Sequence, residues 1–432
     1  MNETNELLSF IAASPTCFHA CDNLAAMFRA AGCTELFETG SEPLMPGRGY
    51  FVRRNASSVI AFRVPTGALT GFMIAASHAD SPTFMVKEGA ELPSANMYIR
   101  LNTERYGGMI LSSWLDRPLS VAGRLLCRGE DGGIVQKLVK IDRDLLVIPN
   151  VAPHMARITD LNPAVDLVPL YGDMAAKDTF LSAVADAAGV KKEDILSSDL
   201  YLYNRMPGTV WGAHNEYISS PKLDDLQCAF SSAKAFCSAC AQEHAMPVCA
   251  VFDNEEVGSQ TKQGAASTFL SDVLHRVNAA LGGTEADYLR AVAGSFMVSA
   301  DNAHAVHPNH PELADPTHRP EMNRGIVIKR HASQHYTTDA VSSAIFSTIC
   351  RMAGVPTQPF YNRSDMNGGS TLGNISGTQV SLNCVDIGMA QLAMHSSYET
   401  AGAKDTEYLI RGLAKLFSSS LTPDTAGGWK VM

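Results

Sequence analysis

The stretch Gly71-Phe72-Met73-Ile74-Ala75-Ala76-Ser77-His78-Ala79-Asp80 joins a strand-length apolar run to a histidine and an aspartate. Similar apolar runs return at residues 248–252, 295–299 and 380–388, and helical patterns such as that of residues 226–243 lie between them. Strands that alternate with helices in this way predict an α/β protein built on a mostly parallel, doubly wound sheet.

The pattern changes to short β runs between residues 85 and 214. Residues 123–127 and 134–139 flank the pair Asp131-Gly132, which strongly favours a hairpin turn. A chain of 432 residues is long enough for two domains. We therefore expect residues 1–84 and 215–432 to share one catalytic domain, and residues 85–214 to form an inserted β-rich domain.

Composition excludes several classes of protein. The chain is 46% hydrophobic and 18% charged, which is typical of a globular protein and not of a disordered or coiled-coil one. Its net charge of -10 disfavours nucleic acid as a partner. The apolar runs are shorter than a membrane helix requires, and the first residues carry Glu3 and Glu6 where an export signal would be basic. We expect a cytoplasmic protein that contacts neither nucleic acid nor membrane.

Histidine and acidic residues follow the predicted strands, at the edge where open α/β sheets place their ligands. His78 and Asp80 have a spacing that lets the imidazole bind a metal while the carboxylate accepts its other N–H. Asp301 follows the strand predicted at 295–299, and His395 follows the last predicted strand. Each position alone is weak, because a histidine or aspartate at a strand end is more often a structural hydrogen-bonding residue.

Two acidic pairs add further candidates. Asp224-Asp225 directly precedes a predicted helix, so one member could be an ordinary N-cap. Glu255-Glu256 follows the strand predicted at 248–252. Neighbouring residues of an extended segment project oppositely, so one glutamate can bind a metal while the other faces a bound water.

Together these positions supply two imidazoles and three carboxylates, with one carboxylate to spare. Such a set suits a pair of zinc, manganese or cobalt ions bridged by one carboxylate. Two close metals can ionise a water and polarise a carbonyl, while the spare carboxylate moves the proton. The predicted ligands are His78, Asp224, Glu256, Asp301 and His395, and the spare carboxylate is that of Glu255.

Several longer motifs follow one another along nearly the whole chain. They include Ser77-His78-Ala79-Asp80-Ser81-Pro82, Trp114-Leu115-Asp116-Arg117, Ser220-Pro221-Lys222-Leu223-Asp224-Asp225-Leu226, Asp253-Asn254-Glu255-Glu256-Val257-Gly258-Ser259 and Leu392-Ala393-Met394-His395-Ser396. In this order they resemble the M18 family of metalloaminopeptidases, the aspartyl aminopeptidases, within the co-catalytic zinc exopeptidases. The resemblance implies the zinc-exopeptidase fold for the catalytic domain.

The resemblance also implies a role for each candidate residue. Asp224 would bridge two metals, zinc in the first place, with His78 and Asp301 completing one site and Glu256 and His395 completing the other. Glu255 would be the general base and Asp80 the partner of His78. The expected reaction is removal of an N-terminal residue, Asp or Glu, from peptides.

Substrate contacts and assembly are likewise implied by the family. Lys329 and His304 would lie beside the substrate, and His154 would reach the active site of a neighbouring subunit. The inserted domain would mediate self-association into a homododecamer. Asn367 departs from the small residue or cysteine that is usual in the family at that position, which leaves the floor of the substrate pocket less defined.

Three other functions remain open from the residues. A related dinuclear-metal carboxypeptidase or amidohydrolase would use the same metals but anchor a substrate carboxylate instead of an amine. An aminopeptidase with a preference for neutral residues would share the whole ligand set. A peptide-binding shell without turnover would have little use for the spare base.

Overall fold

The structure, a computed structural model, describes residues 2–432. Within these residues the largest sheet, called the central sheet here, has nine strands. They lie in the order β1 (Thr34–Leu36), β2 (Gly49–Arg54), β3 (Ser58–Arg63), β13 (Ala245–Phe252), β4 (Gly71–His78), β14 (Phe296–Ala300), β18 (Asn383–Gly388), β16 (Ile326–Arg330) and β17 (Thr357–Tyr361).

The middle of the central sheet is parallel, which confirms the predicted doubly wound α/β fold. Strands β13, β4, β14 and β18 pair in parallel, whereas the pairs β3·β13 and β16·β18 that flank them, and β2·β3 further out, are antiparallel. All residues of β4, β13 and β14 are buried, as expected for strands covered on both faces. Their carboxyl ends therefore meet at one edge of the sheet.

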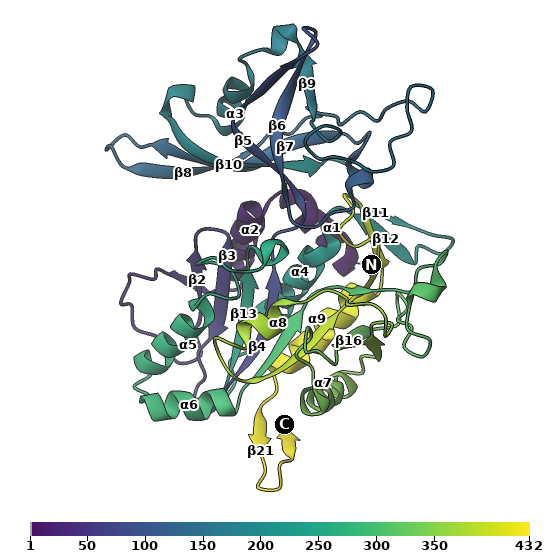
Figure 1. The fold of residues 1–432 in the computed structure, drawn as a ribbon. Coiled ribbons are helices and arrows are strands. Elements are labelled where there is room, and N and C mark those ends of the chain that lie inside the picture. The colour runs from purple at the N-terminus through teal and green to yellow at the C-terminus, as the bar shows by residue number, and fades with distance from the viewer. Residues whose placement is uncertain (1) are drawn as a thin grey trace.

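Helices cover both faces of the central sheet and bury its apolar side chains (Figure 1). One face packs against α1 (Asn2–Ala13), α2 (Cys17–Ala30), α4 (Leu223–Ser238), α7 (Ala340–Met352) and α9 (Asp405–Phe417). The other packs against α5 (Phe269–Ala280), α6 (Glu285–Ala293) and α8 (Leu372–Ser376). Helix α4 begins and ends a few residues before the predicted range of 226–243.

A second sheet, called the inserted sheet here, lies at the top of Figure 1 and has a hydrophobic core of its own. Its strands lie in the order β8 (Ile134–Lys140), β7 (Leu119–Arg128), β10 (Ile195–Asn204), β5 (Thr83–Ser94), β6 (Tyr98–Tyr106) and β9 (Leu170–Asp173), with α3 (Phe180–Ala188) alongside. The predicted hairpin is present as β7 and β8, with Cys127 opposite Val135. The division of the chain at residues 85 and 214 remains a prediction, although this sheet runs from Thr83 to Asn204.

A third sheet, the rim sheet, borders the carboxyl edge of the central sheet. Its strands lie in the order β11 (Thr209–Trp211), β12 (Tyr217–Ser220), β20 (Glu399–Gly402), β19 (Ala390–Leu392) and β15 (Ala303–His304), and β21 (Leu421–Pro423) pairs separately with β22 (Trp429–Val431). Short 3-10 helices are η1 (Leu111–Trp114), η2 (Met174–Ala176), η3 (Lys192–Asp194), η4 (Glu255–Val257) and η5 (Pro311–Leu313). Across residues 2–432, no helix combines the length and apolarity that crossing a bilayer requires.

Candidate metal centre

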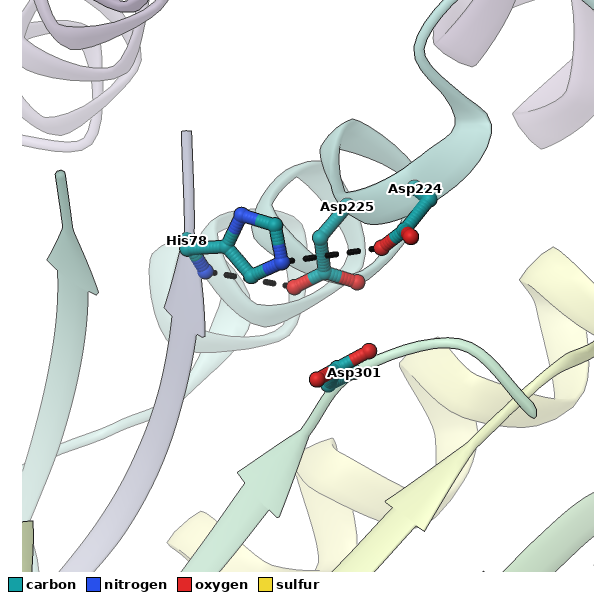
Figure 2. Close-up of side chains that lie close together, drawn as sticks. All are labelled: His78, Asp224, Asp225 and Asp301. Atoms are coloured by element: carbon teal, nitrogen blue, oxygen red, sulfur yellow. Dashed lines mark hydrogen bonds and ion pairs between the residues drawn. The ribbon is translucent and has the colours of Figure 1, made fainter. Parts of the chain in front are cut away.

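The predicted ligands converge where the parallel strands end. His78 is the last residue of β4 and lies opposite Phe252 of β13, so η4, which follows β13, brings Glu255 and Glu256 beside it. Asp301 directly follows β14, and Asp224 lies in the first turn of α4. Figure 2 shows His78, Asp224, Asp225 and Asp301 gathered around one space.

His78 presents its two ring nitrogens to different partners. Nδ1 lies 3.1 Å from the backbone oxygen of Asp80 and 3.4 Å from its carboxylate. Nε2 lies 3.5 Å from Oδ1 of Asp224 and 3.9 Å from Oε2 of Glu255. The Asp80 side therefore orients the ring, and Nε2 faces the carboxylates.

Asp224 lies between the two imidazoles. Its Oδ1 faces His78, and its Oδ2 lies 3.4 Å from Nε2 of His395. The same His395 nitrogen lies 3.4 Å from Oε2 of Glu256. Three groups have atoms close enough to hold an ion. Two of them share Asp224, namely His78, Asp224, Asp225 and Asp301 on one side and Asp224, Glu256 and His395 on the other, and the third is His78, Glu255 and Glu256.

Asp225 differs from the N-cap alternative. The N-cap position of α4 is Lys222, and no side chain caps this helix within the described part of the chain. Instead the backbone N–H of His78 donates to Oδ2 of Asp225 at 3.2 Å, and Asp225 is fully buried. The second carboxylate of the pair thus anchors the end of β4 beneath the centre.

The buried carboxylates of this cluster favour a bound cation. Burial and neighbouring carboxylates raise the pKa of Glu255 to about 8, although His78 acts in the opposite direction. Burial and Asp224 also raise the pKa of Glu256. Burial opposes ionisation of Asp224 too, but the neighbouring imidazoles of His395 and His78 outweigh it and lower its pKa. Oδ1 of Asp224 and Oε1 of Glu256 are buried without a hydrogen-bond partner in residues 2–432. Buried oxygens of this kind fit divalent cations, which accept carboxylate and imidazole ligands.

Comparison with known proteins agrees with this donor set. The profile of the family described as "Aminopeptidase I zinc metalloprotease (M18)" matches residues 10–417. A probable M18 family aminopeptidase 2 of Clostridium acetobutylicum is 45% identical over 424 residues, covering 96% of this chain and 98% of that protein. Its counterpart in Mycobacterium leprae is 38% identical, with the same shares covered.

The chain belongs to the M18 family. It is thus a metalloaminopeptidase by family, as the motifs predicted. Solved structures agree: a chain of a complex of Ape4 and Nbr1 has a TM-score of 0.92 and 34% identity, over 96% of this chain and 85% of that one. A chain of the mApe1 dodecamer of S. cerevisiae has a TM-score of 0.85 and 27% identity, over 96% of both chains.

A cavity of about 290 Å³ opens beside the candidate centre of this M18 protein. Glu255, whose side chain is 15% exposed, borders the cavity together with Asp224, Asp301 and His395. The rest of its wall is formed by Asn302, Ala303, His304, Lys329, Tyr336, Phe360, Gly369, Ser370, Thr371 and Met394. The predicted positions His304 and Lys329 therefore face the same space as the candidate ligands, whereas Asn367 is exposed and lies outside this wall.

Lys329 lies near the end of β16 and is buried, not solvated. Its ammonium donates to the backbone oxygens of Asp301 at 2.7 Å and Asn302 at 3.2 Å, and lies 3.7 Å from the Asp301 carboxylate. Burial opposes its charge, yet Asp301 and the surrounding groups raise its pKa. Lys329 is thus a charged partner of a candidate ligand as well as part of the cavity wall.

Three residues complete the comparison with the sequence predictions. His154 is exposed in the segment between β8 and β9 and does not border the cavity of its own chain. Glu399, at the start of β20, was missed: it accepts the backbone N–H of Asp224 at 3.0 Å and of His395 at 2.8 Å. Tyr106 was also missed, and it donates to Asp80 at 2.7 Å. Neither has a sequence signal, because Glu399 contacts Asp224 from 175 residues away and Tyr106 contacts Asp80 from 26 residues away.

Proposed function

We propose that this M18 enzyme is a dinuclear-metal aminopeptidase that removes an N-terminal Asp or Glu from peptides. The observation that carries the proposal is Asp224, whose two carboxylate oxygens each face a different imidazole. His78 and Asp301 would hold one ion, and Glu256 and His395 the other. Zinc is the expected metal, because the family is one of zinc metalloproteases and the donors are imidazole and carboxylate.

Two bound divalent ions would supply an activated water and a polarised carbonyl. The chain's own residues would do the rest. Glu255 borders the cavity without being needed as a ligand, so its carboxylate would accept the proton of the attacking water and deliver it to the leaving amine. Asp80, at 3.4 Å from Nδ1 of His78, would hold the imidazole so that Nε2 faces the centre.

Lys329 supports the acidic preference. An ammonium has three N–H donors, and two of them are directed at backbone oxygens of the chain. The Asp301 carboxylate, at 3.7 Å, is beyond hydrogen-bond distance. One donor of this ammonium therefore remains for the carboxylate of a substrate side chain in the cavity.

A preference for neutral residues is the second candidate. Phe360, Met394 and Tyr336 give the cavity wall an apolar part that suits an aliphatic side chain. A panel of Asp, Glu, Leu and Ala peptides, each with a free or acetylated N-terminus, decides between the two preferences. Cleavage of the acetylated peptides alone would contradict an aminopeptidase and favour the carboxypeptidase or amidohydrolase alternative.

We also propose that the chain self-associates, with residues 85–214 as the assembly domain and His154 reaching a neighbouring subunit. A relative of known structure is described as a dodecamer, and it covers 96% of this chain. The exposed position of His154 supports a contact outside its own subunit. Light scattering of the purified protein measures the assembly directly.

The decisive experiment on the chemistry is Glu255→Gln. The amide cannot accept a proton, so we expect turnover to fall at least about a thousandfold while metal content stays near two ions per subunit. Glu243→Gln is the control, because Glu243 is 79% exposed and precedes the start of β13, whose opposite end lies beside His78. Loss of metal from the Glu255 variant would make Glu255 a ligand and contradict its role as base.

A further inference from the structure

We propose that Tyr106, a residue of the inserted sheet, is a positioning residue for the hydrolytic reaction. It acts through Asp80, which fixes the turn that carries Glu255 and Glu256. This inference rests on the proposed function, because it assigns those two glutamates to the reaction. Tyr106 is the last residue of β6, so the inserted sheet would contribute directly to the geometry of the catalytic centre.

Asp80 gathers four polar contacts. Its Oδ1 accepts the backbone N–H of Glu255 at 3.1 Å and lies 3.4 Å from Nδ1 of His78. Its Oδ2 accepts the backbone N–H of Glu256 at 3.1 Å and the hydroxyl of Tyr106 at 2.7 Å. The carboxylate is buried, and these contacts fix it in one orientation. The backbone of η4 is therefore held from the Asp80 side.

The direction of the Tyr106 proton follows from Asn254. The oxygen of the Asn254 amide accepts from Thr261 at 2.8 Å and from Gln263 at 2.7 Å, which fixes the orientation of the amide. Its nitrogen therefore faces the Tyr106 hydroxyl and donates to it at 2.9 Å. Because the hydroxyl oxygen is the acceptor there, its own proton points to Asp80.

The residues after Tyr106 contact two turns of the centre, the one that carries Glu256 and the one that carries His395. Gly107 has φ +77°, and a Cβ at this position would lie 3.1 Å from Cβ of Glu256. The backbone N–H of Ile110 donates to the oxygen of His395 at 3.0 Å. Since Tyr106 does not border the 290 Å³ cavity, its influence is on the groups that react and not on the substrate.

The test is Tyr106→Phe, which removes the hydroxyl and keeps the ring that packs on Tyr201 at a centroid distance of 5.7 Å. Removing a group that orients metal ligands typically costs about ten- to a hundredfold in activity or metal affinity. We expect kcat to fall by this factor while KM changes less than about threefold. Amide hydrogen exchange in a peptide covering residues 253–259 should accelerate about tenfold, because the two N–H donors of η4 lose a fixed acceptor.

Tyr201→Phe is the matched control, because Tyr201 lines a small cavity together with Tyr106, packs on its ring, and makes no side-chain hydrogen bond within residues 2–432. It should leave kcat, exchange and melting temperature unchanged. An unchanged kcat and an unchanged exchange rate in Tyr106→Phe would overturn the inference, as would equal effects in both variants. An inactive wild type would instead contradict the proposed function, and the exchange measurement would still test Tyr106.

Discussion

Lys329→Met separates two roles proposed for one ammonium. The ammonium bonds two backbone oxygens of the chain, and Lys329 lines the cavity, where its third N–H donor would meet the substrate. Methionine preserves most of the apolar stem but removes every donor. A hydrogen bond to a charged group contributes about 1.5 to 3 kcal/mol, and about 1.4 kcal/mol corresponds to a factor of ten in rate. Loss of the substrate contact should therefore cost about one to two powers of ten in kcat/KM.

That loss applies only to substrates with an acidic first residue. Loss of support for Asp301 applies to all substrates alike, because Asp301 faces the centre whatever the substrate side chain. The quantity to measure is thus the ratio of kcat/KM for Asp and Leu peptides of otherwise equal sequence, in wild type and variant. We expect the ratio to fall about ten- to a hundredfold, on top of any loss common to both peptides.

Equal losses for Asp and Leu peptides would refute the role of Lys329 in reading the substrate. They would leave it as a partner of Asp301 and favour the neutral preference suggested by Phe360 and Met394. Thermal unfolding of the same variant provides a second measurement. In the metal-free protein, leaving the buried Asp301 without its cation should destabilise the fold by about 3 to 5 kcal/mol.

Three further predictions concern the metals, the assembly and pH. His78→Ala should remove metal and activity together, and wild-type metal content in that variant would contradict its place in the centre. Deleting residues 90–210 should give a smaller particle with little activity, whereas a full-sized particle by light scattering would refute the assembly role. Burial raises the pKa of Asp405 to about 7, above its unfolded value, so ionisation should destabilise the fold as pH rises from about 4 to 7. Across that pH range the wild type should lose stability relative to Asp405→Asn, by about 4 kcal/mol at most. If the melting temperatures of both proteins changed equally with pH, the prediction would be wrong.

The central sheet could be predicted because its information is local. Runs such as 72–76 and 248–252 are apolar throughout, as expected for buried parallel strands, and their spacing by helices fixed the fold class. The candidate ligands could be proposed for the same reason. His78 and Asp301 follow the carboxyl ends of such strands, where parallel strands place their side chains together.

The parts that escaped prediction depend on contacts between distant segments. The rim sheet pairs strands of two to four residues from widely separated parts of the chain, such as β12 with β20, and strands this short carry no periodicity. Glu399 and Tyr106 are recognised only through the N–H and carboxylate groups that folding brings to them. The N-cap alternative for the Asp224-Asp225 pair failed because Asp225 bonds β4, which is 147 residues away in sequence.

The backbone around the candidate centre explains why these distant partners are needed. Lys222, Asn254 and His395 all have left-handed backbone, with φ of 56°, 63° and 67°. For a residue with a side chain this conformation costs about 1 to 2 kcal/mol, and glycine would avoid the cost. His395 cannot be glycine if its imidazole is a ligand, so its turn needs another stabilising contact, and Glu399, four residues later, provides one by accepting its backbone N–H. The η4 turn after Asn254 is held in the same way by Asp80. The turns that carry the candidate ligands are therefore strained, and buried carboxylates on other elements offset the strain. This arrangement is expected where the position of a side chain matters more than local stability.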